Sequence, residues 1–66
     1  MIKNGFTFKV VGENITGEVD GLTREGIWSV VFRENGCMFA RYDVYESTIK
    51  NNLELGIYEE VQYHGI

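Results

Sequence analysis

Two side chains in the sequence have the intrinsic reactivity for catalysis: Cys37 and His64, its single cysteine and single histidine. A cysteine thiolate becomes reactive beside positive charge, and a hairpin in which Arg33 faces Cys37 would supply that charge. His64 lies close to the end of the sequence, where backbone is seldom held rigidly enough for general-base catalysis. Neither residue has a catalytic partner at a recognisable spacing. We therefore expect no catalytic residues and a protein that is not an enzyme.

Metal and cofactor sites are not predicted either. A structural zinc site needs about four ligands, and Cys37 and His64 are the only soft candidates. Calcium needs about six to eight oxygens from a shaped loop, a spacing that the carboxylate pairs do not show. These pairs are Glu18 with Asp20, Asp43 with Glu46, and Glu59 with Glu60.

The length limits how stable one copy of the chain can be. The sequence has 66 residues, of which 44% are hydrophobic and 14% aromatic, which excludes an intrinsically disordered segment. A core of this size supplies roughly 3–5 kcal/mol without disulfides, metals or a partner chain. A lone cysteine cannot form a disulfide within the chain, so a homodimer is one expected source of further stability.

Charge and hydropathy bear on partners and location. Ten acidic and six basic residues give a net charge of −4, so no bulk field attracts nucleic acid, which makes it the less favoured partner. The first residues lack the apolar run of a signal peptide, and no stretch is long enough to span a membrane. We expect a cytoplasmic protein with a reduced cysteine and no membrane partner.

The pattern of apolar residues predicts an all-β fold with one short helix, in a single domain over residues 1–66. Alternation of apolar and polar side chains predicts a five-stranded antiparallel sheet. Ile49 and Leu53, four residues apart and followed by Gly56, predict a helical turn near 47–55. The strands are predicted near residues 5–11, 14–20, 26–33, 37–44 and 57–63.

The two hairpins can be given a register. A loop at Gly12 and Glu13 places Phe8 opposite Gly17, so that the aromatic ring covers the bare glycine. In the second hairpin we favour a three-residue loop, 34–36, with Gly36 in the left-handed position of a bulge. This register sets Trp28 opposite Tyr42 on the core face. On the other face it sets Val31 directly opposite Phe39.

Part of the sequence resembles a known class of small barrels. The segments "GEVDGL", "WSVVFRENG" and "STI" are similar to the layout of chromo-barrel, Tudor and KOW-type SH3-like domains, over roughly residues 14–50. The resemblance implies a closed SH3-like barrel that binds peptides, modified side chains or nucleic acid. It also suggests an aromatic cage, although most of its candidate members are needed for the core. An OB-like fold or a simple meander with one helix fits the same pattern. The cage candidates are Trp28, Phe32, Tyr42 and Tyr45.

The non-core face of the second hairpin is the predicted site of function. Ile27, Val31 and Phe39 form its apolar centre, and Arg33 and Arg41 lie at the rim, a composition typical of protein interfaces. An exposed patch of this kind usually marks a partner. We therefore expect a protein-binding module with a partner of unknown identity. The alternative is that the helix or the N-terminal segment covers this face.

Two further functions fit the sequence. Lys9, Arg33 and Arg41 alternate with apolar residues on outward faces, and such surfaces can bind single-stranded nucleic acid. Small acidic barrels without chemistry also occur among phage and mobile-element accessory proteins that inhibit a larger host protein, an analogy of size and class. In that version, an acidic surface would imitate phosphates, and its residues would be Glu54, Glu59 and Glu60.

Overall fold

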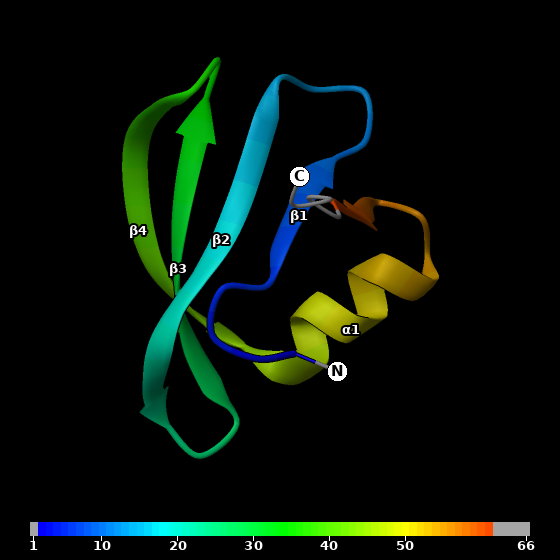
Figure 1. Ribbon diagram of the computed structural model, residues 1–66. Helices are drawn as coiled ribbons and strands as arrows, with labels where there is room; N and C mark the ends of the chain where they lie inside the picture. The colour runs from blue at the N-terminus through cyan, green and yellow to red at the C-terminus, as the bar shows by residue number, and fades with distance from the viewer. Residues whose placement is uncertain (1, 62–66) are drawn as a thin grey trace, which may run out of the picture.

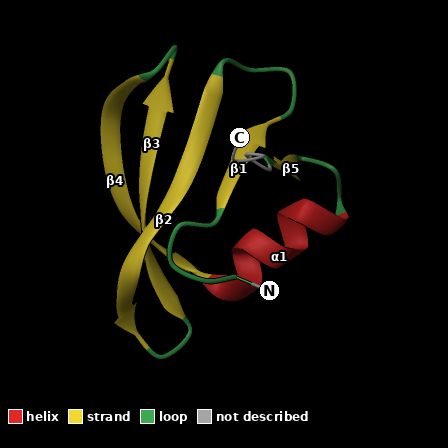
Figure 2. Ribbon diagram, viewed as in Figure 1, coloured by secondary structure: helices red, strands yellow, loops and turns green. Residues whose placement is uncertain are grey.

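A computed structural model of the chain describes residues 2–61, which form one antiparallel sheet and one helix. The strand order in the sheet is β4-β3-β2-β1-β5, so β4 and β5 lie at its two ends (Figures 1 and 2). The elements are β1 (Thr7–Val10), β2 (Ile15–Arg24), β3 (Ile27–Glu34), β4 (Cys37–Tyr45), α1 (Glu46–Glu54) and β5 (Tyr58–Glu60).

The predicted all-β class with one short helix is confirmed, but the predicted closed barrel is not. Closure would require pairing between β4 and β5, and within residues 2–61 the sheet ends at these two strands. The three-residue β5 pairs only with β1, which leaves one side of β4 unpaired. The helix contacts both end strands and covers the open side of the curled sheet (Figure 2).

The register of the first hairpin is as predicted. Phe8 lies opposite Gly17, and the N–H of Val19 donates to the carbonyl oxygen of Phe6 at 2.8 Å. A Cβ atom on Gly17 would overlap Cζ of Phe8, so the ring occupies the space that any side chain there would need. The turn itself covers residues 11–14 and is longer than the predicted two-residue loop.

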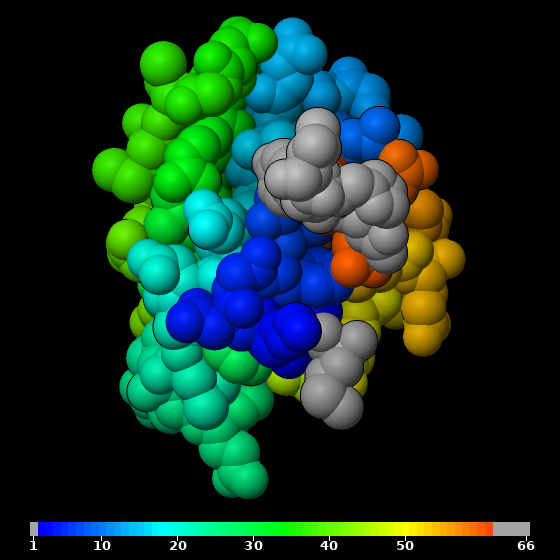
Figure 3. Space-filling view, in the orientation of Figure 1, coloured from blue at the N-terminus to red at the C-terminus, as the bar shows by residue number. Residues whose placement is uncertain are grey.

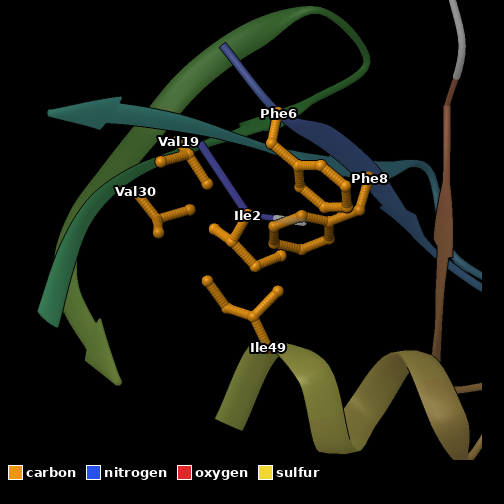
Figure 4. Close-up of a cluster of buried hydrophobic side chains, with 6 residues drawn as sticks. All are labelled: Ile2, Phe6, Phe8, Val19, Val30 and Ile49. Carbon is orange, nitrogen blue, oxygen red and sulfur yellow. The ribbon is translucent and has the colours of Figure 1, made fainter. Parts of the chain in front are cut away.

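The core lies between the concave face of the sheet and the helix. Ile49 is the buried residue of α1, and it points toward the side chains of β1 and the N-terminal segment (Figure 4). That segment is held by a hydrogen bond from the N–H of Gly21 to Oδ1 of Asn4, at 2.8 Å. The helix and the N-terminal segment therefore cover the core face, not the face that carries Val31. The buried cluster is Ile2, Phe6, Phe8, Val19, Val30 and Ile49.

Three element boundaries differ from the predictions. β2 continues to Arg24 through the stretch expected to be a loop, because Gly21, with φ of +102°, allows register shifts between Val19 and Leu22. The helix is shifted by one residue from 47–55, and Gly56, with φ of +77°, follows its end as predicted. The last strand spans only Tyr58–Glu60, and residues 62 and 63 lie outside the described residues.

Candidate functional site

The turn of the second hairpin differs from the prediction. Asn35 and Gly36 have φ of +53° and +85° and form a two-residue turn, so that Glu34 pairs with Cys37. This pair of left-handed residues is the one a type I′ turn requires. The predicted three-residue loop is therefore wrong, because the glycine serves the turn and not a bulge beside it.

Met38 pairs with Arg33 and not with Phe32 as predicted, and a bulge after it returns residues 40–44 to their predicted faces with different partners. The register shifts between Phe32 and Arg33, so that Phe32 pairs with Ala40 and Phe39 becomes the extra residue of β4. Trp28 consequently faces Val44 and not Tyr42 as predicted. The core-facing set of β3 is the one expected, but β4 is displaced along it.

The predicted apolar patch is divided by this register. Val31 lies between Glu18 and Arg41, not opposite Phe39, and only 4% of it is exposed. Ile27 is half-buried opposite Tyr45. Among the three predicted apolar contacts, only Phe39 presents a large exposed surface.

Ion pairs cover the outer face around Val31. Nη1 of Arg33 lies 2.8 Å from Oε1 of Glu18. Nη1 of Arg41 lies 3.0 Å from Oδ2 of Asp20 and donates to Oγ of Ser29, also at 3.0 Å. The charged groups of Glu18 and Arg41 lie on the two strands that flank Val31. Their side chains cover the valine, which explains how a residue outside the core cluster is buried.

The cations proposed for nucleic-acid binding are therefore all paired. Arg33 and Arg41 are in the contacts just described, and Nζ of Lys9 lies 3.1 Å from Oε1 of Glu59. A phosphate would have to compete with a carboxylate at each position. Pairing with fixed carboxylates also removes the net positive charge on which counterion release depends.

Exposed apolar side chains are concentrated on β4. Residues 2–61 contain eight large hydrophobic side chains that are exposed, and four of them belong to this nine-residue strand. Their exposed fractions lie between 55% and 63%. In the space-filling view, the green atoms of β3 and β4 form one margin of the molecule, away from the helix (Figure 3). The four residues are Met38, Phe39, Tyr42 and Tyr45.

The strand also has free backbone. β3 is its one neighbour in the described sheet, so the hydrogen-bonding groups along the other side of β4 have no strand partner there. Natural proteins usually protect such an edge with proline, several charges or a bulge. The six residues after the bulge carry only Arg41 and Asp43 as charges, and the sequence has no proline. We call residues 38–45 the β4 edge.

The aromatic cage suggested by the resemblance is not assembled. Nε1 of Trp28 donates to Oε1 of Glu46 at 2.9 Å, and Phe32 packs against the core. Tyr42 pairs with Val30 and Tyr45 with Ile27, which places the two tyrosines on opposite faces of β4. Phe32 and Tyr42 are neighbours, with ring centroids 5.9 Å apart, but Tyr45 cannot join them around one cation.

The residues with catalytic potential have surroundings that differ from those expected. Cys37 is exposed and faces Glu34 across the hairpin, so its neighbour is an acid and not Arg33. Two surface grooves are lined by residues 9–14 with Glu34 and Glu59, and by residues 3–7 with Glu60 and Val61; Cys37 borders neither. His64 lies outside the described residues.

The predicted acidic surface is also divided. Glu59 pairs with Lys9 on the outer face, whereas Glu60 faces Phe8 and so points to the other side of the sheet. Glu54 is the last residue of α1. Sequence adjacency had suggested one surface, but strand alternation separates the two glutamates.

Two general features of the described chain complete the site. No group of three or more histidine, cysteine, aspartate or glutamate side chains with metal-binding geometry occurs in residues 2–61. Over the same residues, no helix has the length and apolar composition needed to cross a membrane.

Within residues 2–61, the β4 edge is thus the one place where free backbone, exposed aromatic rings and a pair of opposite charges coincide. Sequence analysis named Phe39 and Arg41 as contacts of this site. It named Tyr42 and Tyr45 only as cage candidates and did not include Met38, because the position of the bulge decides what β4 exposes. No protein-family model, curated protein or solved structure matches the chain.

Proposed function

We propose that the protein is a non-enzymatic binding module whose β4 edge pairs with an extended segment of a protein. The observation that carries this proposal is the exposure of four large apolar side chains along a strand that has one free side. In strand addition, backbone hydrogen bonds supply affinity and alternate side chains supply specificity. Phe39, Tyr42 and Tyr45 are suited to the second role.

The composition of the edge favours a protein over a nucleic acid. Its central charges, Arg41 and Asp43, have opposite signs, so the strand presents no positive track. Phosphate recognition needs uncompensated cations, whereas a protein strand offers backbone donors and acceptors and apolar side chains of its own. Peptide binding is also among the functions that a resemblance to SH3-like domains implies.

An accessory protein that inhibits a larger host protein is one form of this proposal. The β4 edge could add a strand to a sheet of the host protein and block its surface. Phosphate mimicry through Glu54, Glu59 and Glu60 is the weaker form, since Glu59 is paired with Lys9 and Glu60 points to the other face.

The proposal is tested by capture from cytosolic extract with the tagged chain and two matched variants. Phe39→Glu places a charge on the β4 edge. Leu55→Glu introduces the same charge at another exposed apolar residue, after the helix. Both variants must first show wild-type circular dichroism and melting. We expect Phe39→Glu to weaken capture of a defined protein at least about tenfold, or about 1.4 kcal/mol, and Leu55→Glu to leave it unchanged.

Equal capture by wild type and Phe39→Glu would contradict the proposal. A captured nucleic acid whose retention falls steeply with salt would contradict it as well and would favour the paired cations of the outer face.

A further inference from the structure

Resting on the proposed function, we infer that the β4 edge pairs with the β4 edge of a second copy of this chain. The two strands run antiparallel about a two-fold axis that passes through Tyr42. The sheets of the two copies then become one continuous sheet. The inference rests on the order of side chains along β4. With the axis through Tyr42, opposite charges and aromatic residues of the two copies face each other. With the axis through Arg41 or Asp43, like charges do.

Geometry restricts the registers that a symmetric pair can use. Residues directly opposite each other in an antiparallel pair point to the same face of the sheet. If both concave faces lie on the same side, the two-fold axis must therefore pass through a residue and not between two. After the bulge, the central positions available are Arg41, Tyr42 and Asp43.

Charge selects among these three registers. An axis through Arg41 sets the two arginines against each other, and an axis through Asp43 does the same with the two aspartates. Like charges directly opposite are destabilising. An axis through Tyr42 instead sets Arg41 of each copy against Asp43 of the other, which makes two complementary pairs.

Both charged side chains have atoms available for these contacts. Arg41 uses Nη1 for its contacts with Asp20 and Ser29, and a guanidinium has further N–H donors on its other nitrogens. Asp43 accepts from Oγ1 of Thr23 through Oδ1, at 3.2 Å. Its carboxylate has further acceptor sites. The contacts within one copy thus orient both charged groups and leave each with donors or acceptors for a second copy.

The same register also pairs the exposed aromatic residues. Tyr42 meets Tyr42 of the second copy on the concave side. Phe39 of each copy, at the bulge, lies beside Tyr45 of the other at the two ends of the paired segment. Ala40 lies opposite Val44, a small residue against a branched one. Three of the four exposed apolar residues of β4 thereby gain an aromatic neighbour, the kind of cross-strand pair that stabilises a sheet.

Pairing of this kind addresses two weaknesses of the single copy. The core of one copy is small, and pairing buries apolar surface that the monomer leaves in water. The unprotected edge is also removed, because each β4 becomes an inner strand.

Disulfide trapping tests the register directly. In a Cys37→Ser background, Tyr42→Cys places two thiols opposite each other. Directly opposed Cα atoms lie about 4.5–5.5 Å apart, within the range that a disulfide spans. In the Phe39→Cys control, the two thiols are separated by roughly 20 Å of strand. After oxidation with diamide, we expect Tyr42→Cys to form mostly cross-linked dimer and Phe39→Cys alone to form no cross-link.

A mixture provides the positive control for the same register. Phe39→Cys combined with Tyr45→Cys should cross-link, since the register brings these two positions beside each other across the interface. Equal cross-linking of Tyr42→Cys and Phe39→Cys alone, or none in any sample, would overturn the inference.

A charge exchange tests the inference without new thiols. Arg41→Asp should weaken self-association, measured by sedimentation at rising protein concentration, at least about tenfold because it faces Asp43 of the other copy. Adding Asp43→Arg should restore it. The double variant does not restore the contact between residue 41 and Asp20, so rescue reports on the contact between copies. Failure of the double variant to associate better than Arg41→Asp would contradict the pairing.

Failure here is distinguishable from failure of the proposed function. A wild-type chain that stays monomeric at millimolar concentration overturns self-pairing. Capture of a different protein, lost in Phe39→Glu and kept in Leu55→Glu, would still support strand addition at the β4 edge.

Discussion

Strands β1 and β4 both carry aromatic and aliphatic side chains, but those of β1 are largely buried and those of β4 are largely exposed. Phe8 in β1 is fully buried, whereas 55% of Phe39 in β4 is exposed. β1 lies between β2 and β5, and its core face is covered by the helix and the N-terminal segment (Figure 4). β4 has a neighbour on one side only. Position in the sheet, more than hydrophobicity, decides which aromatic residue stabilises the fold and which is available to a partner.

Burial is not restricted to the concave face. Val31 is as well buried as the core residue Ile2, yet its cover consists of charged side chains from β2, β3 and β4. The outer face is thus closed by ion pairs at its centre and open only along β4. This contrast defines where a partner strand can bind.

The largest expected effect comes from the same truncation made in both strands. Phe8→Ala should destabilise the monomer by about 3–5 kcal/mol, because it empties the centre of the core. A core of this size supplies roughly that much in total, so the variant should be largely unfolded. Phe39→Ala should cost less than about 1 kcal/mol of monomer stability. Chemical denaturation at low concentration measures both, and equal costs would show that β4 belongs to the core.

A smaller effect should follow from adding a methyl group under the ring of Phe8. Gly17→Ala should destabilise the protein by about 1–3 kcal/mol, because its Cβ would overlap a buried ring with little freedom to move. Phe8→Leu removes the far end of that ring, so the double variant should be more stable than the sum of the two single costs predicts. Strict additivity in thermal unfolding would contradict this packing.

A weaker effect is expected from the cover over Val31. Replacement of Arg33 by methionine keeps most of the aliphatic stem and removes the ion pair with Glu18. Partly exposed pairs contribute about 0.2–1 kcal/mol, and the loss should shrink as salt is added. Arg24→Met, at the exposed end of β2, is the matched control. A salt-independent loss above about 2 kcal/mol would show that the pair acts as a buried one.

The smallest effect concerns acid pH. Hydrogen bonds from Trp28 and Lys50 hold the pKa of Glu46 below its ordinary value of 4.5. A carboxyl group with a lowered folded-state pKa stabilises the fold above its unfolded pKa, and this contribution disappears as the pH falls through the folded value. Wild type should therefore lose more melting temperature than Glu46→Gln between about pH 5 and pH 3. Identical pH profiles would contradict this role.

Much of the fold could be predicted because local signals and burial agreed. Phe8 over Gly17 needs both an aromatic residue and a glycine at matched positions, and the end of the helix follows from Gly56. The faces of β3 were correct for the same reason. These features depend on alternation and turn chemistry that are visible in short stretches of sequence.

The rest depends on features that short stretches do not specify. A single extra residue at Phe39 decides whether Val31 faces an aromatic ring or Arg41, and a one-residue slip has the same local pattern. Closure of the barrel depends on which distant strands pair, and the described β5 pairs with β1 and not with β4. The candidate site lies on β4, whose exposed residues depend on both the bulge and the open edge of the sheet. The sequence therefore identified only part of it.

Amide hydrogen exchange along β4 tests the central claim most directly. The amides of β1 should be protected in the free chain at every concentration, because both sides of that strand are paired. Those of residues 40–45 that face outward should exchange rapidly at low concentration and become protected as the chain is concentrated or its captured partner is added. Protection that appears elsewhere on the sheet, while exchange along β4 is unchanged, would show that β4 is not the binding edge.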